Sequence, residues 1–488
     1  MPLRNLTIIM FAALLSVACY TRASRNRFAA TLLDAMNIIE SEYVDDVEPR
    51  KLFEGAMDGM VNQLDPYSGY SPPEEYQQFQ EQMDQGFVGI GVFVEIDPKS
   101  KRLTIMSPLV GSPAFKAGIK SGDVIMAIDD IDTTGMTLKE STTHIKGRAG
   151  TVVKLSVLHL GEEAPVDISV ERAEIPIESV YGDIRDKEGK WIFHLQEKPN
   201  IGYIRIHTFG ERTATETEAA LETFKEPGQG VDALILDLRG NSGGLLTSAI
   251  DICDQFLEDG VIVSTKGRNN QERSRTTATA GVKISPDTPM VVLVDKFSAS
   301  ASEIVAACLQ DHQRAVVVGQ RSWGKGTVQN IIKLEGGKSA LRLTVARYSR
   351  PSGKNIHKSA DAKDTDDWGV SPNPGLEVNL TSDQFETWMK ARRQRDIMTY
   401  TGQARSTLTP TEEKKGEEPN GEKKKDERKS APDTKNESPS VAPPIPPPDQ
   451  PEPKGDKVEP ASYSDPQLQK AIEYLQDKLL KASQPRPA

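Results

Sequence analysis

The sequence predicts a multidomain α/β protein: an N-terminal helical segment, a β-rich domain, an α/β core, a disordered linker and a C-terminal helix. The hydrophobic period changes from helical to alternating near residue 86, and apolar strands alternate with helical runs from residue 173. After residue 400, Lys, Glu, Pro, Ser and Asp dominate. These changes divide the chain into residues 1–25, 26–85, 86–172, 173–400, 401–462 and 463–488.

Charge and composition exclude several functional classes. The net charge of -11 argues against a nucleic-acid binder. Three cysteines, Cys19, Cys253 and Cys308, cannot build a disulfide framework. The six histidines are scattered, and no H-E-x-x-H, C-x-x-C or EF-hand pattern occurs. We therefore predict neither a metal site nor a cofactor.

Residues 1–25 have the pattern of a targeting segment. Arg4 precedes an apolar run at residues 6–18, and small residues follow. The run is short for a transmembrane helix. Cys19 suggests lipidation, although Ser16 stands where an aliphatic residue is usual. We expect export to the periplasm or cell envelope, and the sequence leaves open whether this segment is cleaved, lipidated or retained as a membrane anchor.

Residues 26–85 predict three helices. Apolar positions recur with helical spacing over residues 28–44 and again over residues 52–64, where Asp65-Pro66 ends the pattern. Pro72-Pro73 opens a third helix. Such helices need a surface to pack on, and two alternatives remain open: a homodimer contact or a brace for the main domain.

Residues 86–172 predict short alternating strands separated by glycine turns. The strands are expected at residues 88–96, 103–106, 124–128, 153–159 and 166–171. Together with the string Ala117-Gly118-Ile119-Lys120-Ser121-Gly122-Asp123, this segment resembles a PDZ domain. The resemblance implies that a peptide C-terminus is held by the backbone of Gly89, Ile90, Gly91 and Val92, and that the peptide adds a strand to the sheet.

Residues 173–400 predict a mainly parallel sheet covered by helices, because apolar strands and helical runs alternate. The strands are expected at residues 201–206, 233–238, 290–294 and 315–318, and the helices at residues 213–224, 245–256 and 303–309. Two further strands are expected at residues 327–334 and 341–348. Residues 401–462 predict disorder, and residues 465–481 an amphipathic helix.

Ser300 lies where a predicted strand meets a helix, in the small-residue loop 298–302. One interpretation is structural, since Ser300-Ala301-Ser302-Glu303 fits a capping box. The other is catalytic, because a helix N-terminus carries partial positive charge where an oxyanion would develop.

Lys325 lies between Gly324 and Gly326, and with Gly319 it almost completes a P-loop. Gly326 occupies the Ser/Thr position, however, and the residues that follow have strand-like composition, so we exclude a nucleotide site. To act as a base, the lysine must be neutral, which requires burial or positive neighbours worth about 4–5 kcal/mol.

Ser242 is a rival nucleophile, since Gly240-Asn241-Ser242-Gly243-Gly244 satisfies G-x-S-x-G after a strand and before a helix. Such a site needs a later acid and histidine, and His312 and His357 are the candidates downstream. The alternative is a tight glycine loop whose amides point at an anion.

Three segments in order, residues 237–244, 297–304 and 324–329, resemble the carboxyl-terminal processing peptidases, the tail-specific proteases of family S41. The resemblance runs from about residue 28 to residue 379, and residues 465–471 resemble that family's closing helix. It implies Ser300 as nucleophile, Lys325 as general base and Gln329 as the residue that positions the lysine. It implies an oxyanion hole from the backbone N–H of Ala301 and of Gly243 or Gly244.

The same resemblance implies an exported serine endopeptidase with a Ser–Lys dyad. Its PDZ domain would capture the apolar C-terminal tail of a protein substrate, and an activator or adaptor protein is an expected partner. Two alternatives stay open: a non-catalytic PDZ binding protein, and an esterase that uses Ser242.

Overall fold

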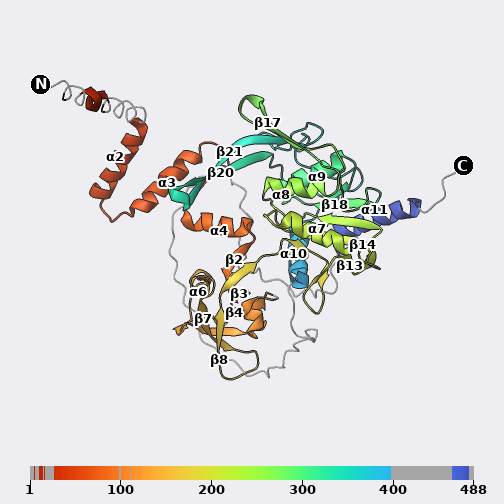
Figure 1. Cartoon of the computed structure of the whole chain (residues 1–488), viewed down its shortest axis with the longest axis horizontal. Coiled ribbons are helices and arrows are strands. Elements are labelled where there is room, and N and C mark those ends of the chain that lie inside the picture. Colours follow the sequence, from red (N-terminus) through yellow and green to blue (C-terminus); the bar gives the residue numbers. More distant parts are fainter. Residues whose placement is uncertain are drawn as a thin grey trace, which may run out of the picture. The chain divides into compact units, whose positions relative to one another are not determined.

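The computed structural model describes residues 5, 10–14, 16, 27–97, 100–109, 111–396 and 464–482 (Figure 1). The predicted linker, residues 401–462, and most of the predicted targeting segment lie outside these ranges. Among the described residues, none of the helices has both the length and the apolar character needed to cross a membrane. The chain divides into two compact units, one made of Met1–Gln78 with Gln329–Val345 and the other of Phe79–Val328 with Ala346–Ala488.

The first unit contains the N-terminal helices, which confirms the helical segment predicted there. They are α2 (Arg27–Glu42), α3 (Pro49–Val61) and the start of α4 (Pro73–Met83). Strand β1 (Gly69–Ser71) pairs antiparallel with the beginning of β21 (Ser339–Ser349), which also pairs with β20 (Thr327–Leu334). Glu335 accepts hydrogen bonds from both Arg50 and Tyr70, and these bonds join α3 to the strands.

The second unit begins with the β-rich domain. Its sheet has the order β3-β4-β5-β7-β8, with β6 paired to β5, and α6 packs beside β3. The bounds are β3 Val92–Ile96, β4 Leu103–Pro108, α5 Pro113–Lys116, β5 Val124–Ile128, β6 Ile131–Asp132, α6 Leu138–Ile145, β7 Val152–Leu158 and β8 Val166–Glu171.

The single strand predicted at residues 88–96 is wrong, because the chain turns in its middle. Gly91 has φ +78°, a left-handed conformation that ends the extended run. Before it, β2 (Gly86–Gly89) pairs with β9 (Ala173–Pro176), whereas β3 after it pairs with β4. The turn at Gly91 thus lets the chain leave one sheet after β2 and enter another at β3.

The α/β core contains the mainly parallel sheet that the sequence predicts. Strands β14, β15, β18 and β19 run parallel in that order, and β10 and β13 pair antiparallel with β14. The bounds are β10 Val180–Tyr181, β13 His194–Leu195, β14 Lys198–Ile206, α7 Thr213–Thr223, β15 Ala233–Asp237, α8 Leu246–Asp254, β18 Met290–Val294, α9 Ala301–Asp311 and β19 Val316–Gly319.

Several elements of the second unit were not predicted. They include α6, the two-stranded pair β11 (Ile184–Arg185) and β12 (Trp191–Ile192), the hairpin β16 (Val261–Lys266) and β17 (Glu272–Thr277), and α10 (Ser382–Asp396). The end of β21 pairs with β16, so the hairpin adds to a second sheet.

The two faces of the parallel sheet are covered by different parts of the chain. Leu234 and Leu236 pack in the cluster formed with α7, α8 and α9, whereas Ala233 and Ile235 pack with α11 (Pro466–Ala482). When successive parallel strands are added to a sheet in one direction and each crossover is right-handed, the connecting helices all lie on the same face. The other face is closed by α11, which lies beside β18 and β19 (Figure 1).

The contribution of α11 to the core can be measured with two leucines on the same helix. Leu475 is fully buried and Leu480 is 65% exposed. We expect Leu475→Ala to lower the free energy of unfolding of the core by about 2–5 kcal/mol, and Leu480→Ala to change it by less than ~0.5 kcal/mol. Denaturant titration followed by tryptophan fluorescence reports this domain, because all four tryptophans lie between residues 191 and 388. Equal effects of the two substitutions would contradict a buried α11.

Candidate active site

Three alternating serines occupy the connection from β18 to α9, and two of them have structural roles. The Ser298 hydroxyl donates to the Leu238 carbonyl at 2.8 Å, and the Ser302 hydroxyl donates to the Asn241 carbonyl at 2.9 Å. Both serines are fully buried, whereas Ser300 between them is partly exposed. The flanking serines therefore fix the neighbouring loop, and Ser300 is the serine presented to solvent.

Ser300 also has an unusual backbone. As N-cap of α9 it has φ +56° and ψ -114°, whereas N-cap residues usually have extended angles. A non-glycine residue in such a region costs about 1–3 kcal/mol and persists only where its surroundings enforce it. This strain is an independent indication of function at Ser300.

The contacts that hold Ser300 in this backbone conformation centre on the carboxylate of Glu303, which is fully buried. One oxygen accepts from the Ser300 and Lys325 backbone N–H groups, each at 2.8 Å. The other accepts from the Ser322 hydroxyl at 2.6 Å and the Gly324 N–H at 2.7 Å. Burial raises the pKa of Glu303, and these hydrogen bonds oppose the rise. One carboxylate thus joins the backbones of the two predicted catalytic residues.

Two further contacts join the same loops. The Tyr348 hydroxyl lies within hydrogen-bonding distance of the carbonyl oxygens of Ser300 and Lys325. The Trp323 N–H donates to the Ser298 carbonyl at 3.0 Å. The lysine loop is therefore tied to the serine loop at Trp323 and, through Tyr348, at Lys325.

The glycines around Lys325 are explained by packing. A Cβ on Gly324 would lie 2.7 Å from Lys358 Cβ, and one on Gly326 would lie 2.4 Å from the His357 nitrogen. Strand β20 begins at Thr327, directly after this loop. A P-loop must open a helix, so this glycine loop is not a P-loop.

The loop at residues 240–244 lies against Ser300. A Cβ on Gly243, which has φ +108°, would lie 2.8 Å from Ser300 Cβ and from the Ala299 oxygen. The Gly243 N–H already donates to the Asn241 side chain at 2.8 Å. Within the described residues, the N–H groups of Ala301 and Gly244 meet no acceptor. Of the three predicted oxyanion donors, Ala301 and Gly244 are therefore the two that keep a free N–H.

The remaining predicted catalytic residue, Gln329, lies on β20 in the other compact unit. Its amide nitrogen donates to the Thr344 hydroxyl at 3.2 Å. Its role in positioning Lys325 stays a prediction.

Ser242 lies in the same glycine loop but lacks the environment of a hydrolase nucleophile. Its side chain is exposed, and α8 begins four residues later at Leu246. His312 directs Nε2 at the Val261 carbonyl, 2.7 Å away. Among the described residues, no hydrogen bond joins Ser242 to a histidine.

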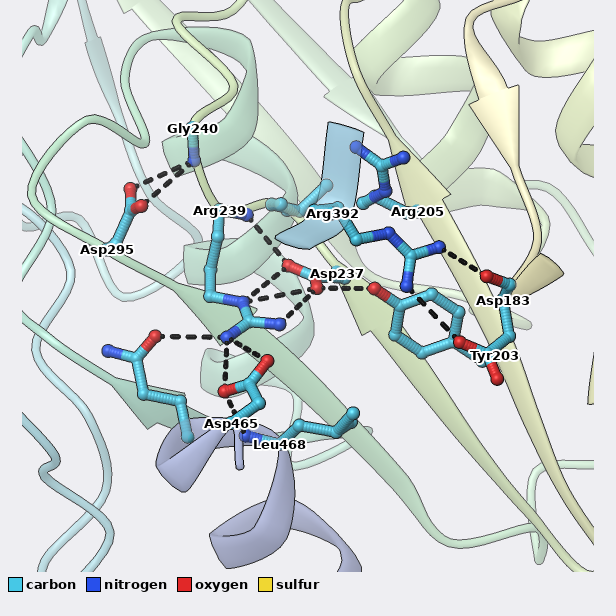
Figure 2. Close-up of polar contacts among 12 residues, drawn as sticks. Asp183, Tyr203, Arg205, Asp237, Arg239, Gly240, Asp295, Arg392, Asp465 and Leu468 are labelled. Carbon is cyan, nitrogen blue, oxygen red and sulfur yellow. Dashed lines mark hydrogen bonds and ion pairs between the residues drawn. The ribbon is translucent and has the colours of Figure 1, made fainter. Parts of the chain in front are cut away.

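A buried polar network lies beneath the glycine loop (Figure 2). Asp237 accepts hydrogen bonds from the Arg239 guanidinium and from the Tyr203 hydroxyl. Burial acts to raise the pKa of Asp237, but the Arg239 charge and the hydrogen bonds from Arg239 and Tyr203 together outweigh it and hold the pKa below its usual value. The Gly240 N–H donates to Asp295 at 3.1 Å. Sequence reasoning missed this network.

The predicted peptide-binding residues of the β-rich domain lie on the turn between β2 and β3. Gly89 ends β2, Ile90 is buried, Gly91 makes the turn and Val92 begins β3. In the described part of the chain, the N–H groups of Ile90 and Gly91 donate to no acceptor. Strand β3 is also an edge of its sheet.

Comparison with family models matches three segments of the chain. Residues 200–373 match the model described as Peptidase family S41, and residues 86–170 match the PDZ domain. Residues 20–74 match the model described as Activating protease CtpB N-terminal domain.

Among curated proteins, the chain is similar to three bacterial proteases. It is 38% identical to the Carboxy-terminal-processing protease of Bartonella bacilliformis, over 66% of this chain and 71% of that protein. It is 36% identical to the Carboxyl-terminal-processing protease of a Synechocystis species, over 67% and 71%. It is also 36% identical to the Carboxy-terminal processing protease CtpA of Bacillus subtilis, over 66% and 65%.

The role of Glu303 can be tested without assaying any activity. Glu303→Gln keeps the shape of the side chain but leaves a single acceptor oxygen, so it cannot accept all four hydrogen bonds. We expect amide hydrogens in residues 322–326 to exchange about tenfold faster or more, measured by mass spectrometry. The exposed Glu226→Gln is the matched control. Unchanged exchange in Glu303→Gln would show that the loops are held by other contacts.

Proposed function

Because this chain belongs to peptidase family S41, we propose that it is an endopeptidase that cleaves protein substrates near their C-termini with a Ser300–Lys325 pair. The relatives named as carboxy-terminal processing proteases support this substrate class. The observation that carries the assignment is the Glu303 carboxylate, which accepts hydrogen bonds from the backbone N–H groups of both Ser300 and Lys325. Gln329 orients the lysine in this proposal.

The proposed reaction proceeds in two steps. Neutral Lys325 takes the proton of the Ser300 hydroxyl as its oxygen bonds to the peptide carbonyl carbon. The Ala301 and Gly244 N–H groups stabilise the oxyanion, and the proton passes to the departing amine as the C–N bond breaks. Lys325 then takes a proton from water as the water oxygen bonds to the acyl carbon, and it returns this proton to the Ser300 oxygen as the ester C–O bond breaks.

We propose that the PDZ domain selects substrates by their C-terminal tails. The free N–H groups of Ile90 and Gly91 suit a carboxylate, and the edge strand β3 can pair with an extended peptide. Helix α6 packs beside β3 and would form the other wall for the apolar side chains of the tail.

The N-terminal helices suit a protein partner. Phe28, Leu33 and Ile38 on α2 are 59–77% exposed, more apolar surface than a helix facing only water usually carries. A second copy of this chain or an activating protein are the two kinds of partner proposed here. Sedimentation of the purified full-length chain distinguishes them, since a monomer at micromolar concentration would contradict the dimer.

The proposed nucleophile and base can be tested on an unstructured protein that ends in an apolar tail. We expect Ser300→Ala and Lys325→Ala each to lower kcat/KM by at least about 10³-fold, because each removes a group that acts in the transition state. Ser242→Ala should retain activity within about threefold. Mass spectrometry of the products gives both the rate and the cleavage sites.

The same assay distinguishes the alternatives. Activity lost only in Ser242→Ala would move the nucleophile to the glycine loop, as in the esterase alternative. Tail binding by the wild type without cleavage would favour a binding protein. Amidation of the substrate C-terminus should raise KM about fivefold or more with kcat unchanged, since it removes a carboxylate bound equally in ground and transition states.

We also propose that the chain is exported, from the targeting pattern at residues 1–25. Fractionation of cells that express the full chain should recover it outside the cytoplasm, in the periplasm or attached to the envelope. A mainly cytoplasmic pool would contradict the proposal.

A further inference from the structure

The C-terminal helix α11 makes two separate contacts with the α/β core, one apolar and one polar. Its apolar side carries Leu468, Ala471, Ile472 and Leu475 into the cluster on the sheet face opposite α9. At its N-terminal end, Asp465 contacts the Arg239 guanidinium through both carboxylate oxygens, each 2.9 Å from Nη1 (Figure 2). The contact between Asp465 and Arg239 is polar and lies under the glycine loop at residues 240–244. It is not needed to cover the face of the sheet.

Arg239 is buried, and its charge is balanced by two carboxylates, one from Asp237 two residues earlier and one from Asp465 at the N-terminal end of α11. Its side chain is 1% exposed, and those of Asp237 and Asp465 are 0% and 14% exposed. Gln467 of α11 adds an acceptor 3.2 Å from Nη1, and the Trp388 ring lies 4.7 Å from the guanidinium carbon. A buried guanidinium that loses one carboxylate keeps an incompletely compensated charge, so it shifts toward other partners or water.

Arg239 is joined directly to the proposed oxyanion loop. Gly240, the next residue, donates its N–H to Asp295, and Asp295 also accepts from the N–H groups of Phe297 and Ser298. The loop that carries Gly244 and the loop that carries Ser300 therefore share Asp295 as an anchor; Figure 2 shows its contact with Gly240. Arg239 fixes where the first of these loops starts.

We propose that Asp465 is a positioning residue for the peptidase reaction. In this proposal the N-terminal end of α11 contributes to the active site. Through Arg239, Asp465 holds the loop whose Gly244 N–H is the proposed oxyanion donor. This inference rests on the proposed function, but it assigns a catalytic consequence to a residue 226 positions from Arg239 in the chain. Loss of a whole oxyanion donor costs about 10²–10³ in kcat, so a misplaced donor should cost less.

Asp465 has a second role that the test must separate from the first. Its carboxylate accepts the Leu468 N–H at 3.0 Å and so caps α11. Asparagine caps helices as well as aspartate does. Asp465→Asn therefore keeps the cap and removes the charge that Arg239 requires, whereas Asp465→Glu keeps the charge.

The experiment compares full-length variants in the cleavage assay and by hydrogen exchange. We expect Asp465→Asn to lower kcat about 10- to 100-fold with KM changed by less than about threefold. Asp465→Glu should recover most of kcat. Amide hydrogens of residues 240–245 should exchange faster in Asp465→Asn, because the loop loses its anchor.

The matched control is Asp477→Asn on the same helix. Asp477 pairs with Lys481 at 2.6 Å, but its side chain is 58% exposed. This variant should match the wild type in kcat and in exchange. The proposal is overturned if Asp465→Asn keeps wild-type kcat and exchange, or if Asp477→Asn impairs both equally.

Failure of the proposed function would be visible separately. If Ser300→Ala still cleaves, or if the wild type does not cleave, the nucleophile assignment fails. Exchange at residues 240–245 then still decides whether Asp465 holds the loop, because that readout requires no catalysis. Unchanged exchange would overturn the coupling, and faster exchange would support it.

Discussion

The candidate active site depends on one buried carboxylate. Glu303 accepts four hydrogen bonds from residues on both the nucleophile loop and the lysine loop. A neutral side chain of the same size has fewer acceptor sites, so the charge state and the geometry are linked. The capping box therefore also organises the candidate site. The glutamate that caps α9 accepts hydrogen bonds from the strained backbone of Ser300 and from the lysine loop, and so holds the two loops together.

Hydrophobic patterning predicted the parallel sheet and its three crossover helices, because strands such as 233–237 carry strong apolar runs whose burial dominates local preference. It failed where the pattern is weak. Strand β17 has the sequence ERSRTT, and α10 is mostly polar, so neither shows an apolar period. Helix α6 is also polar, yet Thr137 and Glu140 form a capping box that could have revealed it.

The candidate site was predictable in its residues but not in its connections. Ser300 and Lys325 follow strands that lie side by side in a parallel sheet, so their loops had to meet at one edge. The contacts that hold the loops of the candidate site join residues far apart in the sequence. The Tyr348 hydroxyl contacts the Ser300 carbonyl, and Asp465 contacts Arg239. Local patterns carry no information about such pairings. Nor could the sequence show that Ser300, a non-glycine residue, has positive φ.

The placement of α11 also determines the order in which the peptidase can be completed. Protein chains are made and begin to fold from the N-terminus. Of the described elements, α11 is the last to be made, after the stretch 397–463. Until it docks, the sheet face formed by Ile235 and Val291 is uncovered, and Arg239 lacks one of its carboxylates. If Asp465 positions the oxyanion loop, full proteolytic activity arises only after every other described element has been synthesised. A nascent chain is then a poor protease, both toward neighbouring proteins and toward itself.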